Sequence, residues 1–243
     1  MTASAAFVER LSQSLESREL ERKSGLGKLA WSGQINGRSC IVTLSRQGRT
    51  RYTGEVRSRE HLGYRLRIEL STAVRVRLFF VRSGFARNPF IRWVYRWRKQ
   101  QVLADVPTSL DGFDVVTADR DYALRLVHQP RAATTISDLL TRNASASLAG
   151  SIHFGPGTIH YASPILQPET LTPDYTFEAI NELLSILATA EQLPAPKVPC
   201  TLTRFERLSK DQPLLVAALI ILAALAALLL GAGLLILLLF LVF

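Results

Sequence analysis

Apolar and polar residues alternate through much of the first third of the chain, which is the pattern of half-buried β-strands. The dipeptide Asn36-Gly37, between the first two apolar runs, is typical of a tight hairpin turn. Farther along, a loop at 71–73 would pair Leu70 with Val74 and would place the apolar side chains of both strands on one face. The predicted strands are 28–35, 38–45, 50–57, 62–70 and 74–82.

The polar face of that last strand pair is unusually charged. The same register would set Glu69 opposite Arg75 and Arg67 opposite Arg77. Like charges that face each other directly across two strands destabilise a sheet. The pattern therefore indicates either an anionic partner or a solvated edge, and we prefer solvation.

Helical spacing of apolar residues replaces the alternation in the remainder of the chain. The clearest case follows Thr172-Pro173, a residue pair that suits the first turn of a helix. Pro130 would separate two shorter helices, and a strand would cover 113–116. The predicted helices are 5–22, 119–127, 134–142 and 174–192, besides a further candidate within 85–101.

Residues 148–162 predict another hairpin, turning at 155–158. Its register would place His153 opposite His160 on the polar face. Two histidines at that separation can ligate a metal, but no acidic or thiol ligand lies nearby in the sequence. We therefore expect exposed histidines and neither a metal nor a cofactor.

The last thirty residues, 214–243, contain no charged side chain and nothing more polar than glycine. A run of this length can span a bilayer as one tilted helix. A re-entrant hairpin bending at 231–233 (Gly231 to Gly233) is the alternative. Ala223, Ala227 and Gly231 recur every four residues, a spacing that permits close packing against a second copy or another membrane protein.

Positive charge flanks this apolar run on its N-terminal side only. Arg204, Arg207 and Lys210 precede the run, and basic flanks remain on the cytoplasmic side of a membrane. The first residues contain no apolar segment of the kind found in signal peptides. We therefore expect a single-pass tail anchor in a bacterial inner membrane, with the N-terminus in the cytoplasm.

Together these elements predict an α+β fold, an antiparallel sheet with flanking helices, followed by one C-terminal transmembrane helix. The net charge of +9 is uneven, because residues 1–104 hold 21 basic and 7 acidic side chains. Such a basic half attracts anionic partners. The predicted domains are a 1–24 amphipathic helix, a 25–193 cytoplasmic α+β domain (basic half 25–104, second half 105–193), a 194–212 proline-rich basic linker and a 213–243 anchor.

Aromatic and basic residues are interleaved in the segment 85–101. If Asn88-Pro89 starts a helix, the aromatic and the basic residues fall on different sides of it. The aromatics could cap the core of the sheet, dock on a lipid surface, or stack on single-stranded nucleic acid, the least favoured of the three. The predicted membrane-surface or anion contacts are Arg87, Arg92, Trp93, Arg96, Trp97, Arg98 and Lys99.

No group of residues in the sequence forms a recognisable catalytic motif. The four histidines lie outside any nucleophile motif. The motifs GxSxG and HExxH and the phosphate-binding Walker loop do not occur in the sequence. Cys40 and Cys200 lie far apart without CxxC spacing, so we expect free thiols. The sequence therefore predicts a protein that is not an enzyme, with an unrecognised hydrolase as the alternative.

The stretches GFDVVTADRDYALRLV and LAGSIHFGPGTIHYAS, followed by a leucine-rich helix, carry a family resemblance. Together with a hairpin that runs from Gly33 to Arg38, the chain over 25–193 resembles bacterial membrane-anchored proteins with an α+β domain of unknown function. The resemblance implies an α+β domain held at a membrane, and it implies no catalytic residue.

These observations predict a tail-anchored, non-enzymatic adaptor or assembly subunit. Its cytoplasmic domain would dock on the anionic membrane surface or on a partner. The expected partners are membrane lipid and, through the transmembrane helix, a second copy or another membrane protein. A membrane-tethered nucleic-acid-binding protein is the alternative from another class.

Overall fold

The computed structural model describes residues 3–25, 28–53, 56–84, 88–143 and 149–203, together with short pieces between 207 and 231. The chain divides into two compact units, Met1–Cys200 and Thr201–Phe243. The first unit holds the sheet, the helices numbered below and a single hydrophobic core.

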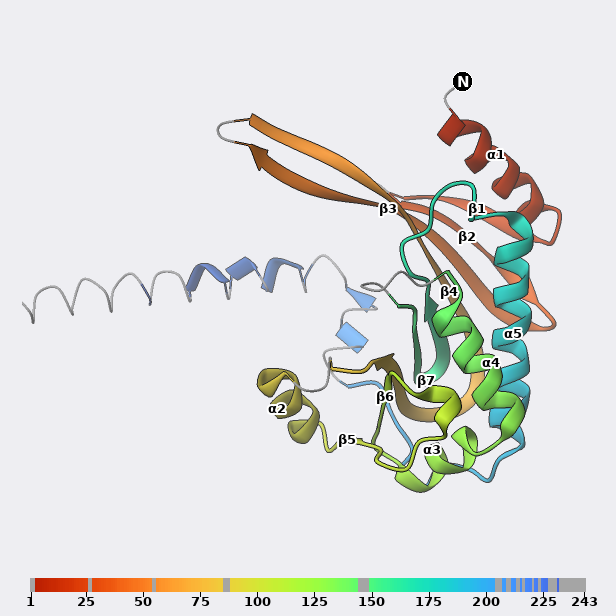
Figure 1. The fold of residues 1–243 in the computed structure, drawn as a ribbon, viewed down its shortest axis with the longest axis vertical. Coiled ribbons are helices and arrows are strands. Elements are labelled where there is room, and N and C mark those ends of the chain that lie inside the picture. Colours follow the sequence, from red (N-terminus) through yellow and green to blue (C-terminus); the bar gives the residue numbers. More distant parts are fainter. Residues whose placement is uncertain are drawn as a thin grey trace, which may run out of the picture. The chain divides into compact units, whose positions relative to one another are not determined.

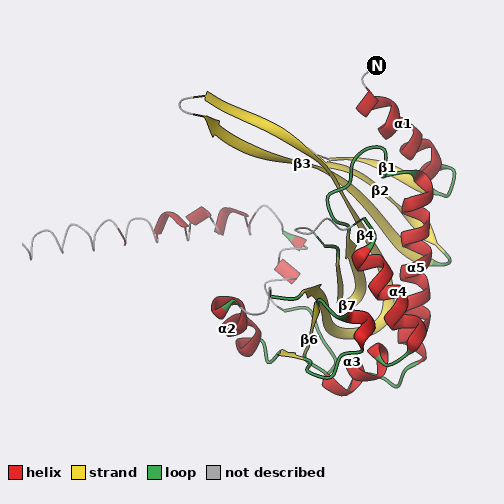
Figure 2. Ribbon diagram, in the orientation of Figure 1, coloured by secondary structure: helices red, strands yellow, loops and turns green. Residues whose placement is uncertain are grey.

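Within the described residues, seven strands form one antiparallel sheet (Figure 1). Their order is β1-β2-β3-β4-β6-β5, and β7 pairs with β4. Helices and sheet are segregated, as Figure 2 shows, so the predicted α+β class is confirmed. The strands are β1 (Leu20–Gly25), β2 (Lys28–Ile35), β3 (Arg38–Thr53), β4 (Val56–Arg82), β5 (Gln101–Val102), β6 (Phe113–Thr117) and β7 (Ser151–Ala162).

The first hairpin forms as predicted. Strand β2 has the expected bounds, and Asn36 and Gly37 both adopt the positive φ of the tight turn, at 50° and 73°. Strand β3 then continues to Thr53 without the predicted interruption, and β4 begins at Val56. The predicted strand 50–57 is therefore wrong, because its two halves belong to different strands. Beyond Gly48 the two strands extend as a two-stranded ribbon (Figure 1).

Strand β4 is the central element of the sheet, and the predicted loop at 71–73 is wrong. The strand continues through Ser71. It pairs with β3 over its first half and with β6 near its end. Strand β7 pairs with β4 from Arg67 to Phe80. The register with β7 shifts between Ser71 and Arg75, and again between Arg75 and Leu78. Extra residues at such bulges bend a strand instead of ending it.

The predicted pairing of Glu69 with Arg75 consequently does not occur. Glu69 lies between Ile41 of β3 and His160 of β7. The like-charged pair of Arg67 and Arg77 is also separated, because Arg67 lies opposite Thr43 and Ala162.

The predicted hairpin at 148–162 is assigned as a single strand, β7, which pairs with β4 and folds back on itself. A Cβ atom at Gly150 would lie 3.2 Å from the Ala162 carbonyl oxygen, and the His153 and His160 rings are 5.5 Å apart, so the two halves lie side by side as predicted. Its Gly155-Pro156-Gly157 segment lies where β4 has its register shifts, so the two strands bend together.

Four helices cover one face of the sheet: α1 (Ala3–Glu16), α3 (Arg120–Val127), α4 (Pro130–Thr141) and α5 (Pro173–Gln192). Helix α5 confirms the prediction, with the Thr172 hydroxyl accepting from the Tyr175 amide as N-cap. Pro130 starts α4 as its first residue, so the predicted start at 134 was late. A short 3₁₀ helix, η2 (Thr108–Leu110), precedes β6.

Helix α1 ends at Glu16, six residues before the predicted end. Glu19 has φ 64°, which turns the chain so that Leu20 starts β1 opposite Gly33. A Cβ atom at Gly33 would lie 2.0 Å from the Glu19 carbonyl oxygen, so the turn and the strand meet only at a glycine.

The core forms between the helices and the side chains that point toward them. Trp31, Val42, Leu66 and Ile68 of the sheet are buried there, and Leu183 of α5 packs in the same cluster. Because side chains alternate along a strand, the neighbours of these residues lie on the other face of the sheet.

The second unit, Thr201–Phe243, contains the whole of the predicted anchor, 213–243. Among the described residues, no helix is both long and apolar enough to cross a membrane. Most of 214–243 lies outside the described residues, including Ala223 and Ala227. Gly231 is helical, and a Cβ added to it would meet no atom within 4 Å. Arg204 and Lys210 lie outside the described residues too, whereas Arg207 is exposed.

Candidate functional site

Helix α2 (Pro89–Trp97) carries most of the predicted contact residues and stands apart from the helical layer (Figure 1). The Asn88 side chain caps it by accepting hydrogen bonds from the amides of Phe90 and Ile91. Pro89 occupies the first turn, where its missing N–H costs no hydrogen bond. This sequence therefore starts a helix directly before the aromatic residues.

No residue between Pro89 and Trp97 is buried. Phe90, Trp93 and Trp97 expose 68%, 60% and 74% of their surface. They share one side of the helix, and the Phe90 and Trp93 rings stack with centroids 5.9 Å apart. The structure thereby contradicts the alternative in which these aromatics cap the core.

Basic side chains surround the aromatic side of α2. Arg92, Arg96, Arg98 and Lys99 are all exposed, and Arg98 is the C-cap residue. Lys99 follows with φ 54°, which turns the chain away from the helix. Of the predicted contact residues, Arg87 lies outside the described residues.

Helix α2 is tied to the sheet at its C-terminal end. The Gln100 amide donates to the Tyr95 carbonyl, and Gln101 then pairs with β6 as the first residue of β5. Tyr95 is half-buried on the side facing the protein, and its burial, followed by the nearby Asp114 carboxylate, raises its pKa. The aromatic side is therefore held pointing outward by contacts on the opposite side.

The closest approach to a catalytic arrangement lies elsewhere, on β4 and β7. The Thr158 hydroxyl lies 2.9 Å from His160 Nε2, and His160 Nδ1 lies 3.4 Å from Glu69 Oε2. The second distance exceeds the range of about 2.6–3.2 Å that a base and its orienting group need. His128, another candidate base, lies with Nδ1 2.8 Å from the Leu124 carbonyl of its own helix.

The predicted neighbourhood of His153 and His160 exists, and the fold-back of β7 produces it. The two rings stack with centroids 5.5 Å apart, and Phe79 stacks on the other side of His153 at 4.1 Å. Within the described parts of the chain, no group of three or more His, Cys, Asp or Glu side chains is arranged to hold a metal.

Neither cysteine forms a disulfide. Burial of Cys40, with a smaller contribution from Glu69, raises the pKa of its thiol to about 12, so it is protonated at neutral pH. Cys200 Sγ lies 2.7 Å from Nε of Arg77, which donates to it.

Sequence reasoning located α2 but did not identify the polar face of the sheet as a site. Its residues are spread over β1, β2, β3, β4 and β7, and only the register of the sheet brings them together. The charged alternation in β4 was the one available signal, and it was assigned to the wrong strand pairing.

Comparison with known proteins gives little direct information on function. No family model matches the chain, and no curated protein matches it. Among solved structures, the chain is similar to the crystal structure of the mycobacterial trehalose monomycolate transport factor A, TtfA. The similarity has a TM-score of 0.45 at 13% identity and covers 80% of this chain and 98% of that one. At this level of similarity, the function must be inferred from the chain's own residues.

Proposed function

We propose that this chain is a non-catalytic, membrane-associated adaptor whose α+β unit docks on an anionic lipid surface through α2. The observation that carries the proposal is the outward side of α2, where Phe90, Trp93 and Trp97 are exposed beside arginines. Aromatic side chains that remain in water after folding still have apolar surface to bury against a partner.

A lipid surface matches both kinds of residue on α2. Tryptophan is enriched at the level of the lipid head groups, where its ring is buried and its N–H stays hydrated. Arg92 and Arg96 would contact lipid phosphates beside the aromatic side, and each basic residue near an anionic leaflet contributes about 1 kcal/mol. The basic half of the chain adds attraction over a longer range.

The shape of α2 favours lipid over nucleic acid. Proteins that bind single strands combine stacking aromatics with a positively charged groove that follows the backbone. Phe90, Trp93 and Trp97 instead lie on the outer surface of a single exposed helix. A membrane-tethered nucleic-acid binder remains the second candidate, and the experiment below includes a measurement for it.

The membrane anchor belongs to the same proposal and is supported by the apolar sequence of 214–243. We place it as a single span in a bacterial inner membrane with the N-terminus cytoplasmic. The spacing of Ala223, Ala227 and Gly231 supports packing against a second copy or another membrane protein. Replacing all three with leucine is expected to abolish crosslinks formed within the membrane.

The test uses the full chain reconstituted in phosphatidylcholine bilayers with or without phosphatidylglycerol. Lipids brominated near the head group quench tryptophans that enter the interface. Trp31 is fully buried in the core and supplies an unquenched reference signal. Docking predicts strong quenching that requires phosphatidylglycerol and declines as salt screens the charges.

The matched variant replaces Trp93 and Trp97 with serine and is expected to remove the quenched component while the Trp31 signal remains. Unquenched tryptophan emission from the wild-type chain in anionic bilayers would refute docking of α2, even if residues 214–243 span the bilayer. Retention of single-stranded oligonucleotides at physiological salt, lost in the same variant, would support the second candidate instead.

A further inference from the structure

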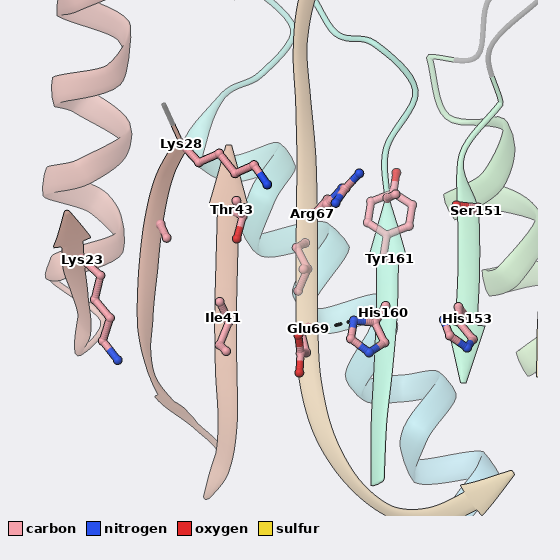
Figure 3. Close-up of a pocket in the computed structure, with 13 residues that line it drawn as sticks. Lys23, Lys28, Ile41, Thr43, Arg67, Glu69, Ser151, His153, His160 and Tyr161 are labelled. Carbon is pink, nitrogen blue, oxygen red and sulfur yellow. Dashed lines mark ion pairs between the residues drawn. The ribbon is translucent and has the colours of Figure 1, made fainter. Parts of the chain in front are cut away.

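A hollow lies on the face of the sheet opposite the buried core, in a part of the molecule that α2 does not reach (Figure 3). Its floor is a single row of neighbouring residues, one from each of β1, β2, β3, β4 and β7. The register of the sheet aligns Lys23, Ala30, Thr43, Arg67 and Ala162 in this row. The small side chains of this row leave space between the long ones. The resulting cavity has a volume of about 780 Å³.

Two histidine rings from β7 line one side of this cavity. His153 and His160 are seven residues apart in β7, which in a straight strand would separate them by about 23 Å. Their ring centroids are 5.5 Å apart, so the strand folds back on itself and brings both rings to this face. Figure 3 shows the His160 ring between Glu69 and the His153 ring.

Three cationic side chains, Lys23, Lys28 and Arg67, line the cavity. Within the described residues, no carboxylate lies within ion-pair distance of Lys23, Lys28 or Arg67, and all three are exposed. Five other cations of the unit do have carboxylate partners: Arg38 with Glu191, Arg51 with Glu60, Arg120 with Asp105, Arg142 with Glu178 and Glu182, and Lys197 with Asp121.

The single carboxylate in the cavity is already engaged. Glu69 lies 3.4 Å from His160 Nδ1, so it faces the histidine wall. Three cations against one carboxylate leave a net positive charge. The cavity therefore favours an anion that lies between β1 and β4.

We propose that this cavity binds a phosphate-bearing organic anion, with Lys23, Lys28 and Arg67 contacting the phosphate. Arginine offers a planar set of N–H donors that matches two phosphate oxygens, and the lysines add charge on the other side. The apolar floor at Ala30 and Ile41 accommodates an uncharged portion of the ligand. A volume of about 780 Å³ lies within the range of small-molecule sites.

The same phosphate chemistry is offered by a soluble phosphate ester and by a phospholipid head group. The first arm titrates inorganic pyrophosphate into the full chain held in phosphatidylcholine nanodiscs and measures binding by calorimetry. The second arm repeats the titration with phosphatidylglycerol in the nanodisc. Loss of the pyrophosphate signal in that arm identifies a head group, and an unchanged signal identifies a soluble ligand.

Charge-removing variants test the assigned residues. Arg67→Gln and Lys23→Gln are each expected to weaken pyrophosphate binding by roughly fivefold or more, as loss of one nearby charge predicts. Glu69→Gln is expected to strengthen binding by roughly threefold, a gain that general damage to the fold would not produce. The matched control is Arg131→Gln, which removes an exposed arginine from α4 on the helical side.

Three results would overturn the proposal. They are the lack of any pyrophosphate binding at millimolar concentration, equal weakening by Arg131→Gln, and unchanged binding in both cavity variants. The Trp93 and Trp97 serine variant is expected to bind pyrophosphate like the wild-type chain. Membrane docking and anion binding therefore succeed or fail separately.

Discussion

Replacing the two exposed tryptophans of α2 is expected to reduce the affinity of residues 1–200 for anionic vesicles by more than a hundredfold. This portion is suited to the measurement because Met1–Cys200 forms a compact unit with its own core. The variant Trp93→Ser/Trp97→Ser removes apolar surface from α2 without removing any basic residue. Phosphatidylcholine vesicles containing phosphatidylglycerol supply the binding surface, and sedimentation measures the bound fraction.

The magnitude follows from the exposed areas. An aromatic side chain of about 200 Å² that is two-thirds exposed presents about 130 Å² to water, and Trp93 and Trp97 expose 60% and 74%. If about half of that area leaves water on docking, each ring contributes about 1.6 kcal/mol at ~25 cal/mol per Å². Two rings contribute about 3 kcal/mol, which corresponds to a factor of more than about 100 in the dissociation constant.

The fold of the double variant should be intact, because no residue of α2 (Pro89–Trp97) is buried. Its thermal midpoint should therefore match that of the wild-type protein. Val198→Ser is the matched control, since Val198 is also exposed, at 51%, but lies after α5. Vesicle binding by the double variant that equals binding by this control would refute the role of α2.

The remaining predictions concern the folded state. Arg38→Ala removes a two-contact pair with Glu191, at 2.8 and 2.6 Å, and is expected to destabilise the fold by about 1–3 kcal/mol in urea titrations. The hydrogen bond from Arg38, and then those from Thr72 and the Ala73 amide, lower the pKa of Glu191, although partial burial acts in the opposite direction. The Glu191 carboxylate therefore contributes its full stabilisation of the fold above its ordinary pKa. That stabilisation is lost as the pH falls through the lowered pKa. Glu191→Gln should remove that acid-side component from urea titrations repeated between pH 6 and 2. Leu183→Ala should cost about 2–5 kcal/mol in the same titrations, because Leu183 is fully buried.

Much of the fold could be predicted from local sequence. Strand β2, the turn at Asn36-Gly37 and helix α5 formed where pattern and capping residues placed them. Each depends on interactions within a few residues of one another, such as the Thr172 cap of α5. The helix α2 was also located from its Asn88-Pro89 start. Its exposed aromatic side was only one of three alternatives, because sequence does not show which neighbours a side chain has.

The errors concern residues whose partners are distant in sequence. Alternation in 62–82 was read as two strands because Ser71-Thr72-Ala73 is a plausible turn, and the sequence gives no sign of β7 as a partner for Ser71. Tertiary contacts then fix the segment, since the Thr72 hydroxyl and the Ala73 amide both donate to Glu191 of α5. A local turn signal is therefore overridden by tertiary contacts, here the pairing of Ser71 with Thr158 and the hydrogen bonds to Glu191.

The shared bend of β4 and β7 also shapes one wall of the proposed anion site. Between Ser71 and Leu78, β4 has more residues than the segment of β7 that lies opposite, from Phe154 to Thr158. This mismatch forces curvature, and the curvature draws His153 toward His160. In straight strands the two rings would lie about 23 Å apart, and His153 would not reach the cavity. The bend thus adds the His153 ring to the cavity wall beside His160 and Glu69, while the exposed Lys23, Lys28 and Arg67 supply the positive charge that attracts an anion.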